Sequence, residues 1–124
     1  MARTYTNFYK NSLLTGGIDF DNDSFAVSLC SGSPGTAATV SGQSQILNLI
    51  PNTTSGCSIS RAESNLSIAT GSFGVVNYNG FVDYLVFANT TKNVVCWWED
   101  GVGLNADAAT EVLFSGVGDY IFTI

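Results

Sequence analysis

Few side chains in this sequence are of the kinds that carry out chemistry, and they gather in two places. The 124-residue chain has no histidine, four Lys plus Arg and ten Asp plus Glu. Carboxylates alternate at Asp19, Asp21 and Asp23, and a second cluster, WWED, occupies 97–100. Alternating carboxylates gather oxygen ligands in calcium loops. Aromatic rings beside carboxylates are a combination found in sugar-binding clefts and glycosidases.

The acidic segment differs from a calcium loop at the positions that define one. The loop pattern requires Gly at its sixth position and Glu at its twelfth, where this chain has Ser24 and Cys30. Asp and Asn also stabilise turns through their own side chains. We therefore expect a turn between a helix and a strand, with no metal ion.

The second cluster also lacks the geometry of a catalytic pair. A glycosidase needs two carboxylates that face each other across the substrate, which adjacency in sequence does not supply. On a strand, Trp97 and Trp98 point to opposite faces. We expect one to pack in the core and the other to contact a partner, because Trp is enriched at interface hot spots.

Enzyme chemistry is not expected anywhere in the chain. Without histidine, a serine nucleophile would need activation by lysine, and neither Lys10 nor Lys92 lies in such a motif. The glycine-rich stretches 71–74 and 101–103 lack the phosphate-binding patterns. The sequence predicts no catalytic residues and no cofactor.

The cysteines bear on disulfide formation, and the overall charge bears on which classes of partner the protein can bind. Cys30, Cys57 and Cys96 are an odd number without CxxC spacing, which favours free thiols and leaves open one disulfide. The net charge is −6 and the four basic residues are scattered singly, so we expect neither nucleic acid nor an anionic membrane as a partner. Charged residues make up only 11% of the chain, which suggests that partners cover much of the surface.

The elements that position these residues begin with a short helix. Apolar residues recur with helical spacing over 4–15, with Thr4 or Thr6 as the N-cap and glycines 16 and 17 as the stop. So short a helix is marginal alone and must pack on something. Phe8 and Leu13 are the candidate contacts on it.

Most of the remaining chain has the pattern of short strands. Apolar residues alternate over 25–29, a largely apolar strand, FVDYLVFA, occupies 81–88, and a polar turn at 89–93 leads into the strand 94–98. The small, polar segment 31–45 is expected to form an exposed loop or arm. The sequence predicts a single mainly β domain over 1–124: an antiparallel sandwich or barrel of about seven or eight short strands with one short N-terminal helix.

The N-terminal segment resembles small structural proteins of tailed bacteriophages. Residues 8–29 read FYKNSLLTGGIDFDNDSFAVSL, similar to that family's F-K-x-x-L-L helix followed by G-x-I-D-L-D-x-D-T-I-K-V-x-L. The strand 81–87 and the terminal GDYIFTI of 118–124 are similar to two of its later strands. The family's aspartate-rich second segment is replaced here by the Ser/Gly/Ala segment after residue 30.

The resemblance implies a role in a virus particle assembled in the cytoplasm of a bacterial host. We expect a capsid decoration, or cement, protein that binds the major capsid protein and forms a homo-oligomer, a trimer or dimer. The candidate interface residues are Phe8, Leu13, Trp97 and Trp98. Two alternatives are a tail, neck or fibre-base component and, in another class, a soluble carbohydrate-binding β-sandwich that uses the tryptophans.

Overall fold

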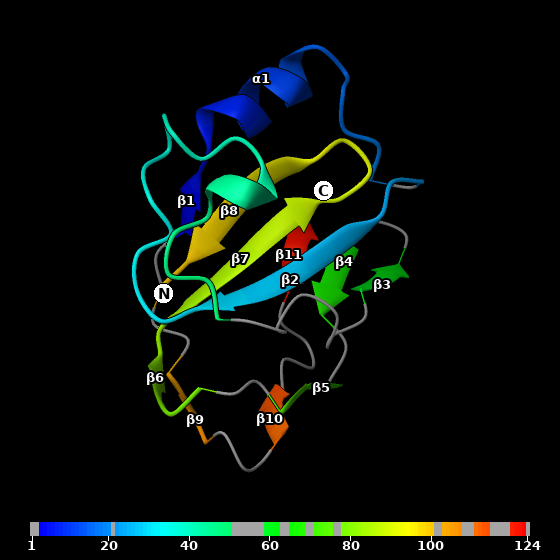
Figure 1. Cartoon of the computed structure of the whole chain (residues 1–124). Helices are drawn as coiled ribbons and strands as arrows, with labels where there is room; N and C mark the ends of the chain where they lie inside the picture. The colour runs from blue at the N-terminus through cyan, green and yellow to red at the C-terminus, as the bar shows by residue number, and fades with distance from the viewer. Residues whose placement is uncertain are drawn as a thin grey trace.

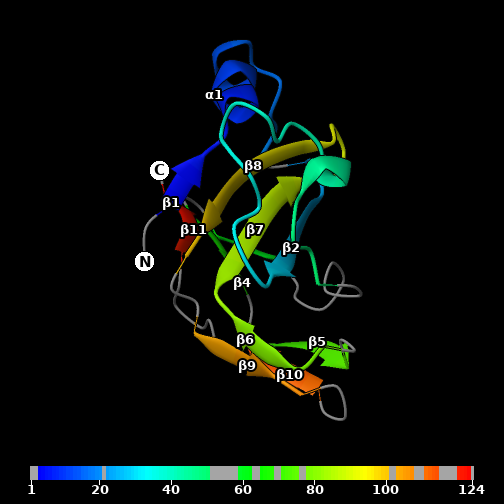
Figure 2. The ribbon, with the colours of Figure 1, turned by 60° about the vertical axis from the view of Figure 1, so that its left-hand side comes forward.

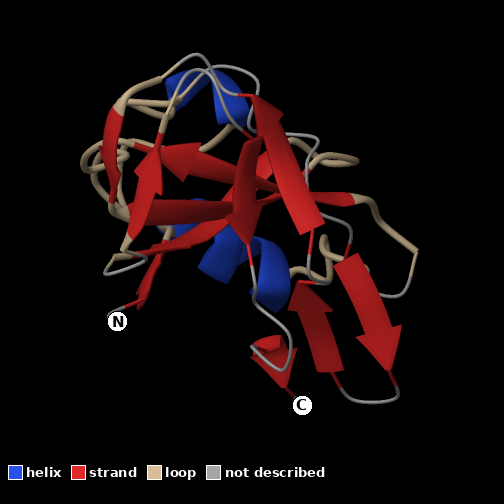
Figure 3. Ribbon diagram, turned by 90° about the horizontal axis from the view of Figure 1, so that it is seen from below, coloured by secondary structure: helices blue, strands red, loops and turns tan. Residues whose placement is uncertain are grey.

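The computed structural model describes residues 3–20, 22–50, 59–62, 65–68, 71–75, 78–100, 103–107, 111–114 and 120–123. Most of its regular structure is strand, drawn in red in Figure 3. The helical segments of this part are α1 (Asn7–Leu14) and the 3-10 turn η1 (Gln43–Gln45). The strands are β1 (Arg3–Tyr5), β2 (Phe25–Cys30), β3 (Ile59–Ala62), β4 (Asn65–Ile68), β5 (Gly71–Val75), β6 (Gly80–Val82), β7 (Tyr84–Asn89), β8 (Val94–Glu99), β9 (Leu104–Ala106), β10 (Glu111–Phe114) and β11 (Tyr120–Thr123).

All strand pairs in these described ranges are antiparallel, and they form four sheets. The largest sheet has the order β1-β8-β7-β2, and the others are β11-β4-β3, β10-β5 and β6-β9. The three-stranded sheet lies behind the four-stranded one in Figures 1 and 2, so the arrangement is sandwich-like. The predicted class, mainly β and antiparallel with a short N-terminal helix, is confirmed. The described strands number eleven rather than seven or eight, since several are pieces of three or four residues.

Helix α1 begins later than the sequence predicts, because the residues before it form a strand. The expected helix over 4–15 is found only over Asn7–Leu14. Thr4 and Tyr5 instead belong to β1, where Tyr5 lies opposite Trp97 of β8. Pairing with β8 joins residues far apart in the sequence, so no local periodicity reports it.

Both ends of the helix have the predicted chemistry. The Thr6 hydroxyl accepts a hydrogen bond from the Tyr9 backbone N–H at 3.1 Å, which satisfies one of the unpaired donors of the first turn. Gly16 has φ of +72°, a conformation that glycine adopts without strain at a helix end. Thr6 and Gly16 thus mark the two ends of the helix.

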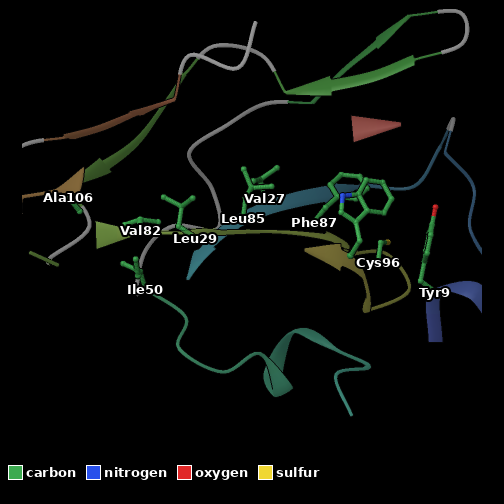
Figure 4. Packing of buried hydrophobic residues seen from close by; sticks show 10 residues of the cluster. Tyr9, Val27, Leu29, Ile50, Val82, Leu85, Phe87, Cys96 and Ala106 are labelled. Carbon is green, nitrogen blue, oxygen red and sulfur yellow. The ribbon is translucent and has the colours of Figure 1, made fainter. Parts of the chain in front are cut away.

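A hydrophobic cluster fills one face of the four-stranded sheet. It is built around Phe87 of the central strand β7, with Val27 and Leu29 from β2 and Trp97 from β8. In Figure 4 Tyr9 lies at one end of this cluster. The other end is formed by Ile50, Val82 and Ala106.

A β-bulge between β7 and β8 changes which side chains reach this cluster. Phe87 lies opposite Trp97 and the next residue, Ala88, lies opposite Val95, so Cys96 is the extra residue. Strict alternation would place Cys96 and Trp97 on opposite faces, but both join the same cluster. A bulge bends a strand and redirects its side chains in this way.

The segment 31–45, predicted to be an exposed loop or arm, lies against the other face of the sheet (Figure 1). Val40 is 1% exposed and belongs to a second cluster with Val86 and Trp98. The Val95 N–H also donates to the Ser41 carbonyl at 2.8 Å. The prediction of exposure is therefore wrong at Val40, because one large apolar residue among small and polar ones carries no periodic signal.

The predicted strand 81–88 is divided in two. β6 pairs with β9, whereas β7 lies between β8 and β2, and Asp83 separates them. The expected central position holds for β7. No helix in the part of the chain that the structure describes has the length and apolar character needed to cross a bilayer.

Candidate interaction surface around the N-terminal helix

Tyr9 anchors helix α1 to the sheet. Its side chain is 2% exposed, and its ring centroid lies 5.5 Å from that of Trp97, edge to face. The Tyr5 ring stacks on Tyr9 at 5.9 Å, and Phe20 lies edge to face at 6.5 Å. Burial raises the pKa of the Tyr9 hydroxyl. Aromatic pairs of this geometry each contribute about 0.5–1.5 kcal/mol beyond their buried area, and Tyr9 is the one buried side chain within α1.

The other apolar side chains of the helix remain partly uncovered. Phe8 is 41% exposed, Leu13 is 45% exposed and Leu14 is 87% exposed. With 3.6 residues per turn, Phe8 and Leu13 lie on the two sides of Tyr9, roughly 140° apart around the axis, and Leu14 points outward. We call Tyr5, Phe8, Leu13 and Leu14 the N-terminal apolar surface. Leu14 and the exposed Tyr5 were not among the predicted contacts, although both belong to the helical pattern.

Charge is sparse beside this surface. Lys10 is the single charged residue of α1, and it is exposed. The Arg3 guanidinium carbon lies 4.6 Å from the Trp97 ring centroid, and its Nε donates to Glu99 at 2.6 Å. Arg3 thus joins β1 to β8, and the surface offers a partner mainly apolar contact.

Trp97 and Trp98 do not lie at this surface. They point to opposite faces of the sheet, as predicted, but both faces are covered, and the side chains are 1% and 4% exposed. Neither tryptophan is therefore exposed in the described structure, and partner contact by one of them stays a prediction. The segment around Val40 covers Trp98, which the sequence did not indicate.

The acidic turn before β2 is held together by its own hydrogen bonds. The Asp19 carboxylate accepts from the backbone N–H of Asn22 at 3.1 Å and from its amide group at 2.9 Å. The Asp23 N–H donates to the Asp19 carbonyl at 2.9 Å. Asp21 lies outside the described residues. These contacts are those of a turn, the interpretation that the sequence favoured.

Asp23 joins this turn to the β7–β8 hairpin. Its carboxylate accepts from the Lys92 ammonium at 2.8 and 2.9 Å and from the Asn89 amide at 2.8 Å. These hydrogen bonds, with one from the Asp19 N–H, lower the pKa of Asp23 to about 2. Nowhere in the described ranges do three or more His, Cys, Asp or Glu side chains meet as a possible metal site.

Two of the three thiols are buried and free. Cys30 and Cys96 lie in different hydrophobic clusters, so the sheet separates them. Burial raises the pKa of each thiol to about 12, which leaves them as small apolar core residues. Cys57 lies outside the described residues.

Among the described residues, three further large apolar side chains are exposed, and they lie outside the helix. Leu47 and Leu49 belong to the segment that returns to the sheet, and Phe81 belongs to β6. Leu49 pairs with Cys30 at the end of β2 through an isolated bridge. These residues give a comparison set for tests of the N-terminal apolar surface.

The chain was compared with protein-family models, curated proteins and solved structures. No protein-family model, no curated protein and no solved structure matches the chain.

Proposed function

We propose that this chain is a structural protein of a bacteriophage particle, and specifically a capsid decoration protein that binds the head shell and stabilises it. The proposal rests on one observation: the segment with the phage resemblance is also the segment with exposed apolar side chains. The segment that resembles phage structural proteins, 8–29, contains the helix whose Phe8, Leu13 and Leu14 remain exposed. Exposed apolar side chains that lie close together are typical of a surface that a binding partner covers.

The proposed partner is the major capsid protein, and the proposed mechanism is repeated weak contact. A shell presents the same surface many times, so each contact can be modest while the assembly gains through multivalency. A homo-oligomer, a trimer or dimer, would match a local symmetry axis of the shell. The low charge, 11% of residues, suits a surface that is largely covered in the assembled virion.

The test is the copy number of the protein in purified particles, measured by quantitative mass spectrometry. A decoration protein is expected in numbers comparable with those of the major capsid protein. A copy number of only one ring of subunits per particle would instead assign it to the tail, neck or fibre base. Electron microscopy of particles with and without the protein then locates it, and absence from particles overturns the proposal.

A further inference from the structure

A polar pocket of about 250 Å³ opens beside Trp98, at the end of the four-stranded sheet. One wall comes from β1 and from the end of β8, another from the start of β7, and the rim comes from the segment 33–37 that crosses the sheet. Its volume is below the range of pockets for drug-sized ligands, so it suits a single small group. The lining residues are Thr4, Ser33, Gly35, Thr36, Ala37, Tyr84, Trp98 and Asp100.

The lining combines hydroxyl groups with one carboxylate and two aromatic rings. Four residues, among them Thr36 and Tyr84, carry hydroxyls, and Asp100 carries the carboxylate. A hydroxyl both donates and accepts, whereas a carboxylate only accepts. No Lys, Arg or His lies among the lining residues, and the chain has a net charge of −6. An anionic ligand is therefore disfavoured.

The rim of the pocket is shaped before any ligand arrives. Gly35 has φ of +138°, and a Cβ at that position would lie 2.5 Å from the Val40 side chain. The Leu47 N–H donates to the Pro34 carbonyl at 2.9 Å, and the Asn7 N–H donates to the Ala37 carbonyl at 2.9 Å. Because the segment is tied at both sides, binding would require little ordering.

We propose that this pocket binds a neutral sugar, with room for about one ring. Sugar hydroxyls both donate and accept, which matches the hydroxyls on four of the eight lining residues, and the carboxylate of Asp100 can accept from them. The Ser33 and Thr36 hydroxyls also bond within their own segment, which holds them in place at the rim. An organic cation could donate to the carboxylate. It has no acceptor for the hydrogen atoms of the four hydroxyl groups, whereas a sugar has both donors and acceptors. The proposal goes beyond the particle role and does not depend on it.

The test is a titration of the ¹⁵N-labelled full chain with glucose, galactose, mannose and N-acetylglucosamine, followed by amide and indole NMR shifts. We expect at least one sugar to give saturable shifts at the lining residues, including the Trp98 indole N–H, at millimolar concentrations. Methylguanidinium and inorganic phosphate serve as the cationic and anionic probes. Saturable shifts with methylguanidinium alone, or no sugar-dependent shifts at the lining, overturn the proposal.

Two matched pairs of variants locate the binding. Asp100→Asn is expected to weaken the sugar about tenfold, as loss of a charged hydrogen bond does, and Tyr84→Phe removes one lining hydroxyl. Asp107→Asn and Tyr5→Phe make the same chemical changes at residues that do not line the pocket. The same spectra report whether each variant is folded. Equal affinity for all four variants would place any binding elsewhere and refute the site.

Discussion

Asp23 is the residue on which the attachment of the acidic turn depends. A buried carboxylate is costly unless it is paired and hydrogen-bonded, and Asp23 meets both conditions through Lys92 and Asn89. The sequence drew attention to this aspartate as a possible metal ligand. Its partners come from a hairpin more than 60 residues away, so only the fold shows which ammonium and amide groups pair with this carboxylate.

The stability of the protein should fall as acid titrates Asp23. Its pKa is lowered from 3.8 to about 2 in the folded chain, so its contribution is complete above about pH 4 and is lost as the pH falls toward 2. Asp23→Asn should be less stable at pH 7 and should show a smaller loss between pH 4 and 2. Urea unfolding at a series of pH values measures both effects. An unchanged loss of stability between pH 4 and pH 2 in Asp23→Asn would contradict the prediction.

At the scale of elements, the junction between β1 and α1 depends on one hydroxyl. Thr6 is fully buried, donates to the Val95 carbonyl at 2.5 Å and accepts from the Tyr9 N–H. Thr6→Val keeps the shape but removes both hydrogen bonds of the buried hydroxyl, so we expect a loss of roughly 1–3 kcal/mol in the free energy of unfolding. Chemical denaturation followed by tryptophan fluorescence measures it.

Thr15→Val is the matched control at the other end of the same helix. The Thr15 hydroxyl also bonds a backbone carbonyl, that of Asn11 at 3.2 Å, but it is exposed and water can replace it. Its effect should stay within about 0.5 kcal/mol. Equal effects of the two substitutions would show that Thr6 does not hold the helix to β8.

The segment 31–45 should behave as part of the core rather than as a free arm. A methyl group at Gly35 would meet Val40 at 2.5 Å, and the backbone there has φ of +138°. Gly35→Ala should therefore cost roughly 1–3 kcal/mol. At Gly17 the nearest atom to an added Cβ is 3.5 Å away, an ordinary contact, so Gly17→Ala should be near neutral. Thermal unfolding measures the melting temperatures of both variants. Similar melting temperatures for Gly35→Ala and Gly17→Ala would mean that the segment is not packed on the sheet.

The elements that the sequence predicts well are those with local signals. The strand over 25–29 alternates, the turn over 89–93 connects β7 to β8, and Thr6 and Gly16 mark the helix ends. β1 escapes prediction because its three residues pair only with β8.

The candidate site follows the same division between local and distant contacts. Helical spacing is a local property, so the sequence can indicate Phe8 and Leu13 as candidate contacts, and both are partly exposed in the structure. The burial of Trp98 cannot be predicted in this way, because Val40, which joins it in the second cluster, comes from a segment with no repeating pattern. The bulge at Cys96 likewise depends on pairing between strands.

At the scale of the whole molecule, binding to the particle should depend on the N-terminal apolar surface and not on exposed apolar residues in general. Phe8→Ser with Leu13→Ser removes two contacts that are 41% and 45% exposed, so the fold should largely survive while occupancy on particles falls at least tenfold. Phe81→Ser with Leu47→Ser is a matched control, since it replaces the same two residue types at positions 53% and 59% exposed. Circular dichroism checks folding, and co-sedimentation with particles lacking the protein measures occupancy. If only the control variant fails to bind, the interface does not include the helix. If both double variants bind at full occupancy, apolar contact through these residues does not drive binding to the particle.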